Sequence, residues 1–280
     1  MTDVAAIVAE TVARIVRDHQ PPDPWQPGAH ADDAATPEAE AVARALAGTG
    51  WPGLAGEDID AAVLAAVELG RGLVSLDQVD ALLGGSPVVD GLVRHGEIGR
   101  AVELRAGDGL REVEIIALAP AAYGDASAVF VVTGQRRGDD VPAEAAADRL
   151  AAWRAASAGY LAGLASAAFE ACLGHVRSRK AFGATLDAQP MVQSRLADAA
   201  TALDGIRLLA CREHSWAALS YAAAACTEVT AACHQLTGAL GYTLDYPLQR
   251  YSRRARAMRS WAEWAADTCT SQERHQPADR

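Results

Sequence analysis

The chain has 280 residues, of which 50% are hydrophobic and only 5% aromatic, and it carries a formal net charge of −11. This acidic balance argues against nucleic acid or an anionic membrane as the main partner, because both are themselves negatively charged. The five cysteines include no Cys-x-x-Cys pair, so we expect reduced, mostly buried thiols in a cytoplasmic protein. Glu170 and Glu228 interrupt the most apolar stretches before they reach the ~20 residues of a membrane span, so no such span is expected.

Residues 1–98 are predicted to form a helical domain. Apolar residues recur at helical spacing after Asp3, and a proline-rich segment at 21–27 ends that pattern. Thr36 followed by Pro37 is typical of a helix start. Further helices are expected at 37–47, 59–69 and 74–83, and another directly after Pro87.

Residues 99–140 are predicted to form a small β domain. Alternating and β-branched runs, such as Val129 to Val132, favour strands, and Gly107-Asp108-Gly109 is typical of a hairpin turn. The polar stretch 136–140 is predicted to be a linker. A closed barrel needs about eight strands of ~5–6 residues, and this segment has room for about three or four. The β domain is therefore expected to be truncated.

Residues 141–272 are predicted to form a four-helix domain, with a polar, frayed tail at 273–280. The expected helices cover about 142–180, 190–214, 215–236 and 247–266. The predicted fold class is therefore mainly α: an N-terminal helical domain, a truncated middle β domain and a C-terminal four-helix bundle.

Four short segments, in this order, carry a resemblance to a known family. They are Gly50-Trp51-Pro52-Gly53-Leu54; Glu68-Leu69-Gly70-Arg71; Arg179-Lys180-Ala181-Phe182-Gly183 followed by Leu196-Ala197-Asp198; and Gln235-Leu236-Thr237-Gly238-Ala239-Leu240-Gly241-Tyr242. Tyr246-Pro247-Leu248 and Arg253 continue the last match in register. Together they resemble the acyl-CoA dehydrogenases, whose domain order is the one predicted above.

The resemblance implies a role in binding FAD. In the family, the arginine and phenylalanine of the third segment reach across a subunit interface to the ADP half of an FAD held by the neighbour. A guanidinium can pair with two phosphate oxygens, and a glycine turn lets backbone N–H groups approach an anion. Taken singly, these residues also have simpler interpretations: Arg179 as a solvated charge, Phe182 as core packing and Gly238 as a helix end. By position, the cofactor contacts fall to Arg179, Phe182, Gln235, Thr237, Gly238 and Ala239.

The catalytic carboxylate of the family has no counterpart here. In register with Arg253, the usual position of this glutamate falls on Ala262, and the alternative position falls near Trp153. Neither side chain can act as a base. Glu263 is the nearest acidic residue and a weak candidate, because one helical position turns a side chain by about 100°. The competing interpretation of Glu263 is a surface ion pair with Arg259.

The run of residues 250–256 looks like the short, non-catalytic partners in heteromeric acyl-CoA dehydrogenases of bacterial steroid side-chain breakdown. This resemblance implies a cytoplasmic subunit that shares FAD with a longer catalytic subunit in an α2β2 heterotetramer. The longer subunit supplies the base and most of the acyl-CoA site. Two alternatives stay open: an autonomous FAD enzyme that uses Glu263, and a flavin-free helical scaffold or binding protein.

Other chemistry-bearing residues have two interpretations each. None of the seven histidines forms a metal-ligand pair, so no metal site is predicted. His175 and His234 lie near the predicted cofactor residues, but a hydrogen-bonded structural role competes. The arginines of the last helix predict a solvated or salt-bridged face, with an acidic partner or a CoA phosphate as the alternative: Arg250, Arg253, Arg254, Arg256 and Arg259.

Overall fold

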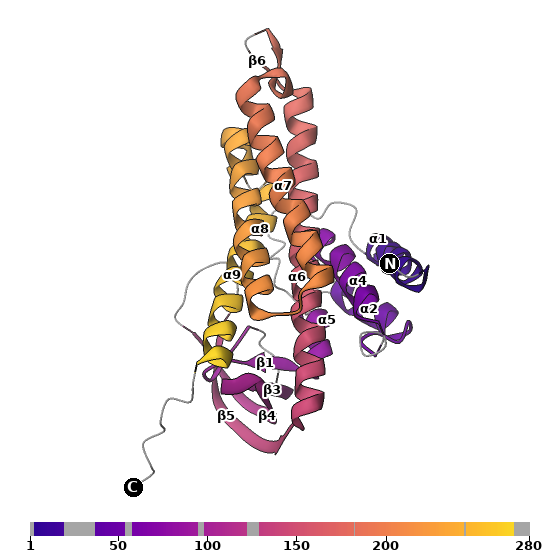
Figure 1. The fold of residues 1–280 in the computed structure, drawn as a ribbon, viewed down its shortest axis with the longest axis vertical. Coiled ribbons are helices and arrows are strands. Elements are labelled where there is room, and N and C mark those ends of the chain that lie inside the picture. The colour runs from indigo at the N-terminus through magenta and orange to yellow at the C-terminus, as the bar shows by residue number, and fades with distance from the viewer. Residues whose placement is uncertain are drawn as a thin grey trace.

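The computed structural model describes residues 3–19, 37–53, 58–94, 98–121, 129–181, 183–243 and 245–271. A long helical bundle forms the body, with the N-terminal helices against one side and a small sheet against one end (Figure 1). The predicted fold class, mainly α with a small β domain between two helical parts, is confirmed.

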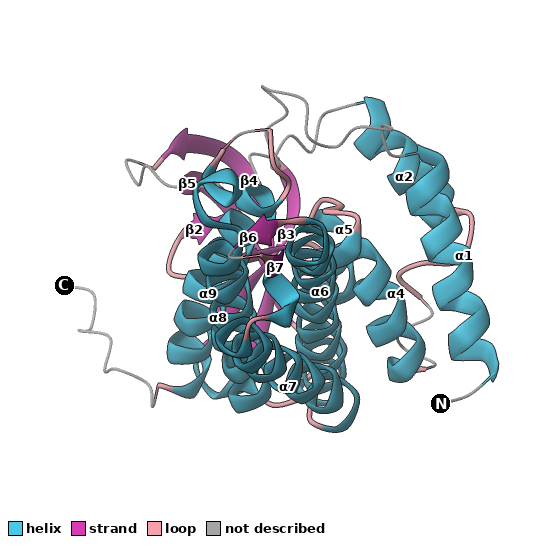
Figure 2. Ribbon diagram, turned by 90° about the horizontal axis from the view of Figure 1, so that it is seen from above, coloured by secondary structure: helices cyan, strands magenta, loops and turns pink. Residues whose placement is uncertain are grey.

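The N-terminal part consists of α1 (Asp3–His19), α2 (Pro37–Ala47), α4 (Ile59–Arg71), α5 (Asp77–Asp80) and the short turn η1 (Ala81–Leu83). Asp58 caps α4 by accepting the N–H of Ala61 at 3.2 Å. α4 packs very closely on the first bundle helix, since a Cβ at Gly70 would collide with the carbonyl oxygen of Tyr160. Viewed along the bundle, α4 and α5 lie next to α6, and α1 and α2 lie beyond α4 (Figure 2).

The sheet has five strands in the order β1-β3-β4-β5-β2. The strands are β1 (Ser86–Val88), β2 (Leu92–Val93), β3 (Gly99–Arg105), β4 (Gly109–Pro120) and β5 (Phe130–Asp140). β1 is parallel to β3, and the other pairs are antiparallel. The predicted hairpin turn at 107–109 joins β3 to β4. A small core of its own lies within the sheet: Val88, Val93, Ala101, Val113 and Ile115.

Two predictions for this region are wrong. The residues after Pro87 form β1 and β2 and not a helix, so the sheet begins before Gly99. Gly91, with φ of +76°, turns the chain between these two strands, and β1 finds its hydrogen-bonding partner in β3. Residues 136–140 continue β5 and are not a linker, because cross-strand ion pairs such as Arg136–Glu114 hold their polar side chains.

The bundle consists of α6 (Ala143–Ser178), α7 (Pro190–Arg212), α8 (Trp216–Thr237) and α9 (Leu248–Thr270), which confirms the four predicted helices. The hairpin β6–β7 (Lys180–Ala181 and Ala184–Thr185) and the turn η3 (Leu186–Ala188) join α6 to α7, and the turn η4 (Gly238–Tyr242) follows α8. α6 is long and apolar enough to cross a membrane, against the expectation from Glu170, but 72% of its most apolar window is buried inside the protein. Its place in the core of the bundle accounts for that apolarity.

Candidate functional site

One end of the bundle brings together the ends of three helices. α6 and α8 both run toward this end, α9 begins there, and the β6–β7 hairpin stands at its tip (Figure 1). We call residues 175–181, 234–243 and 245–252 the helix end. It contains five of the predicted cofactor residues: Arg179, Gln235, Thr237, Gly238 and Ala239. The sixth, Phe182, lies outside the described residues.

Most of these predicted cofactor residues face solvent. Arg179, Gln235, Gly238 and Ala239 are exposed. Thr237 is buried, and its hydroxyl donates to the carbonyl oxygen of Cys233 at 2.9 Å within its own helix. A contact between Thr237 and a cofactor stays a prediction. Because the hydroxyl is engaged within the helix, the backbone of Thr237 would have to make that contact.

Gly238 ends α8 in a backbone conformation that suits glycine. Its φ is +60°, and its N–H donates to the carbonyl oxygen of His234. Apart from its chain neighbours, nothing in the described structure lies within 4 Å of the position that a Cβ would take. The turn thus leaves open space beside the backbone, into which a bound group can fit.

Arg179 lies close enough to His175 for its charge to act on that imidazole. Burial, with a smaller effect from the charge of Arg179, lowers the pKa of His175. The ring of His175 meets Tyr246 edge-on at 6.2 Å, and the Tyr246 hydroxyl donates to the carbonyl oxygen of Ala171 at 2.9 Å. Within the described ranges, no carboxylate forms an ion pair with Arg179. Its guanidinium can therefore pair with an external anion.

His234 lies beneath the turn and has the structural role that the sequence left open. Its side chain is 7% exposed, and its Nε2 lies 2.8 Å from the Ser252 hydroxyl on α9. Tyr242 stacks on the ring with the centroids 4.5 Å apart and the planes 26° from parallel. Burial, with a smaller effect from the charge of Arg256, lowers the pKa of His234, which favours the neutral imidazole.

The positions matched to the family's base hold no acid. Ala262 is buried in α9, and Trp153 is buried in α6, where its indole N–H donates to Asp80 Oδ1 at 2.9 Å. Glu263 is exposed and accepts a hydrogen bond from Arg259 Nε at 2.8 Å, as the surface-pair interpretation predicted. Its carboxylate is therefore engaged on the outside of the bundle.

Asp80 is a buried carboxylate that sequence reasoning missed. It is 1% exposed and accepts hydrogen bonds from Arg94 and from Trp153; the Arg94 Nε bond measures 3.1 Å. The Arg94 guanidinium lies over the ring of Trp261, 5.8 Å from its centroid. With both oxygens engaged, Asp80 is placed to hold the structure together and not to accept a proton from a substrate.

Two more indoles bind aspartates where the sheet meets the bundle. Trp216 donates to Asp108 Oδ1 at 2.6 Å, and Trp264 donates to Asp90 Oδ2 at 3.1 Å. Both aspartates lie in turns with positive φ. We call the whole group the sheet–bundle junction: Asp80, Asp90, Arg94, Asp108, Trp153, Trp216, Trp261 and Trp264. Four tryptophans, three of them buried, fill this boundary.

The predicted solvated arginine face of α9 is wrong for two of its members. Arg250 and Arg254 are buried, and Arg254 donates to the Tyr160 hydroxyl at 3.1 Å. Positions 250 and 254 are one helical turn apart, so both fall on the face that packs against the bundle. Burial lowers the pKa of Arg250. Arg256 is exposed, as the prediction required.

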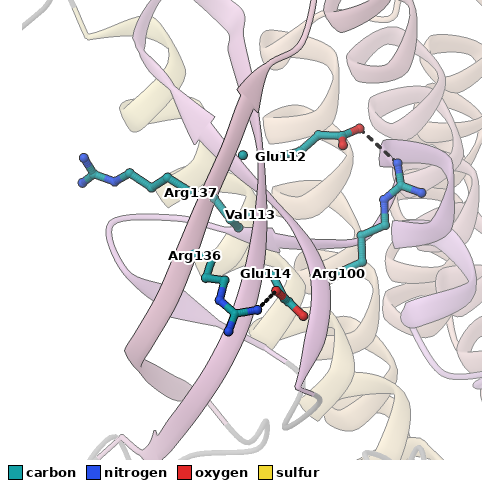
Figure 3. A pocket seen from close by; sticks show the side chains of 7 residues that line it. Arg100, Glu112, Val113, Glu114, Arg136 and Arg137 are labelled. Atoms are coloured by element: carbon teal, nitrogen blue, oxygen red, sulfur yellow. Dashed lines mark hydrogen bonds and ion pairs between the residues drawn. The ribbon is translucent and has the colours of Figure 1, made fainter.

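A hollow of about 420 Å³ lies on the sheet (Figure 3). Ion pairs Arg100–Glu112 at 3.0 Å and Arg136–Glu114 at 3.2 Å engage most of its charges. It contains none of the predicted site residues: its lining is Arg100, Glu112, Val113, Glu114, Arg136, Arg137 and Gly138. In the part of the chain that the structure describes, no group of three or more His, Cys, Asp or Glu side chains could hold a metal ion.

Sequence comparisons with known proteins match the C-terminal helical part of the chain. Residues 143–262 match the model of the acyl-CoA dehydrogenase C-terminal domain. Over 107 residues the chain is 35% identical to the mitochondrial short-chain specific acyl-CoA dehydrogenase of Bos taurus. That stretch covers 34% of this chain and 26% of the bovine protein, so the match spans about a quarter of the relative's length.

Solved structures share the fold over almost the whole chain. A variant of the Tcur3481–Tcur3483 steroid ACAD matches with a TM-score of 0.70 at 18% identity, covering 94% of this chain and 96% of that one. The ChsE4–ChsE5 complex of Mycobacterium tuberculosis matches with a TM-score of 0.68 at 15% identity, covering 96% and 95%. PigA with FAD and proline matches with a TM-score of 0.71 at 12% identity, covering 95% and 96%.

Proposed function

We propose that this chain is a non-catalytic subunit of a heteromeric acyl-CoA dehydrogenase, because residues 143–262 match the model of that family's C-terminal domain. In this proposal the chain completes an FAD site that a longer partner subunit holds for the most part. The complex removes hydrogen from the Cα–Cβ bond of an acyl thioester, and the partner supplies the base. FAD, when bound, provides the hydride acceptor for this oxidation.

The observation that carries the proposal is the state of the two base positions. Ala262 has no acid, and Trp153 is a hydrogen-bond donor whose indole is committed to Asp80. A general base must come within hydrogen-bond reach of the proton that it removes. Among the described residues, the tryptophans of the sheet–bundle junction occupy this region, and the proposal therefore assigns the base to the partner subunit.

The helix end supports the cofactor half of the proposal. Arg179 is exposed, and no carboxylate among the described residues pairs with it, so its guanidinium is assigned to the pyrophosphate of FAD. The open turn at Gly238 and Ala239 allows the backbone to approach the same group. Gln235 is exposed beside that turn, and its side-chain amide can donate a further hydrogen bond to the cofactor. These residues bind and orient the cofactor and move no proton.

Similar structures support a partner subunit. The Tcur3481–Tcur3483 steroid ACAD and the ChsE4–ChsE5 complex each pair two named components in a fold like this one. We extend the proposal to a cytoplasmic heterotetramer of two such pairs, assembled through the bundle. An autonomous enzyme that uses Glu263 is disfavoured, because that carboxylate is exposed and bound to Arg259.

Flavin content tests the proposal. We expect the chain expressed alone to purify with little or no FAD, because most of the site lies on the partner. Co-expressed with a longer acyl-CoA dehydrogenase subunit, it should give about one FAD per pair and not two, since each pair forms one shared site. The absorbance spectrum against protein concentration provides the count. Full flavin occupancy in the lone chain would support an autonomous enzyme, and a colourless preparation in both cases would support a flavin-free scaffold.

A further inference from the structure

We propose that Tyr242 is a stacking platform for the adenine ring of FAD. This inference rests on the proposed function and adds to it a residue that selects the adenosine end of the cofactor. It concerns a side chain outside the set that the sequence assigned to cofactor binding.

The first argument is the exposure of the Tyr242 ring. One face of the ring lies against His234 at a centroid distance of 4.5 Å, yet the side chain is still 70% exposed. A ring that is covered on one face and largely exposed must present its other face to solvent. A flat apolar face left open in this way is suited to stack with an aromatic ligand.

The second argument is that the platform is held rigidly. His234 is buried and fixed by its contact with the Ser252 hydroxyl at 2.8 Å. The residue before Tyr242, Gly241, is buried, and a Cβ at that position would collide with the Thr237 hydroxyl. The backbone and the supporting ring are therefore fixed before any ligand arrives, and stacking costs little conformational entropy.

The third argument is the position of the platform relative to the open turn. Gly238 and Tyr242 are the two ends of the five-residue turn η4. A turn of this type rises by about 2 Å per residue, so its ends lie roughly 8 Å apart, a distance that ADP can span between its phosphates and its base. If the partner holds the flavin ring, the ring that reaches this chain is the adenine.

The test uses the assembled complex, stripped of flavin and titrated with ADP and with inorganic pyrophosphate. We expect Tyr242→Ala to weaken ADP binding about fivefold to a hundredfold, the range of a lost base–aromatic stack. Pyrophosphate binding should not change, because pyrophosphate has no base. Tyr242→Phe keeps the ring and should bind ADP as the wild type does. Tyr221→Ala is the matched control, since Tyr221 is another exposed tyrosine, in α8 away from the turn.

The outcomes separate this inference from the proposed function. If Arg179→Ala weakens the binding of both ligands while Tyr242→Ala changes neither, the platform is wrong and the FAD site stands. If the wild-type complex binds neither ADP nor FAD, the proposed function fails as well. If Tyr242→Ala reduces recovery of the partner subunit without a change in ADP affinity, Tyr242 is a protein contact and the inference is overturned.

Discussion

Arginine and aromatic side chains are exposed at one end of the bundle and buried at the other. At the helix end, Arg179 and Tyr242 face solvent around an open glycine turn. At the sheet–bundle junction, Arg94 and Trp153 are buried and bound to Asp80. In the acyl-CoA dehydrogenase resemblance both regions serve the active site, one at the ADP end of FAD and the other at the base. Among the described residues, these side chains are exposed at the helix end and buried at the junction.

This difference in burial predicts that mutations at the two ends have different effects, on ligand binding at one end and on stability at the other. A buried guanidinium destabilises the fold when its carboxylate is removed, because an unpaired charge is left away from water, and an exposed guanidinium without a carboxylate is free to bind. Mutations at the junction should therefore lower the free energy of unfolding. Mutations at the helix end should weaken FAD binding and leave the fold intact.

The largest effect is expected for Asp80→Ala. Removing the carboxylate leaves Arg94 buried without its ion pair, which should lower the free energy of unfolding by about 3–5 kcal/mol. Urea denaturation of the purified chain measures the change. Glu114→Ala is the matched control, because the Arg136–Glu114 pair is exposed and its loss should cost less than about 1 kcal/mol. Equal losses in both variants would show that the junction is not the stabilising element.

Arg179→Ala should affect the cofactor instead. Loss of a charge-assisted contact to pyrophosphate should weaken FAD retention in the complex by roughly tenfold to a hundredfold, about 1.5–3 kcal/mol. Turnover of the enzyme with its flavin site filled should change much less. Phe182→Ala is expected to act in the same direction. Equilibrium dialysis of FAD gives the affinity. An unchanged FAD affinity in both variants would show that Arg179 and Phe182 do not bind the cofactor.

A smaller effect is expected for Trp216→Phe. The substitution keeps an aromatic ring beside Arg154 but removes the indole N–H that donates to Asp108 at 2.6 Å. We expect a loss of about 1 kcal/mol in the free energy of unfolding, the usual net value of one hydrogen bond. Trp264→Phe, which loses the more exposed bond to Asp90, should cost less. Thermal unfolding that ranks the two variants in the reverse order would contradict this account.

The sequence predicted the local features of the fold well. The starts of α2 and α7 follow from Pro37 and Pro190, and the four bundle helices were predicted with nearly the bounds that the structure shows. It failed where a distant partner decides the structure. Pro87 looks like a helix start, but the residues around it pair with β3, and the register from Ser86 to Ala101 cannot be read locally.

The candidate site divides in the same way. Arg179 and Gly238 could be proposed from the sequence because they stand in short contiguous motifs, and their contact with a cofactor stays a prediction. Asp80 escaped because its partner Trp153 is far along the chain and nothing in its own neighbourhood marks it. The support of Tyr242 by His234 was equally hidden, since stacking depends on how η4 folds back onto α8.

Turnover of the assembled complex with Glu263→Gln tests the central claim most directly. Glu263 pairs with Arg259 on the surface, and such a pair contributes only about 0.3–0.5 kcal/mol to stability, so the variant should fold normally. If the partner supplies the base, the rate should stay within a few-fold of the wild type, and removal of the partner's glutamate should abolish it. A loss of about 10²-fold or more, typical of a missing general base, would make this chain catalytic and contradict the account.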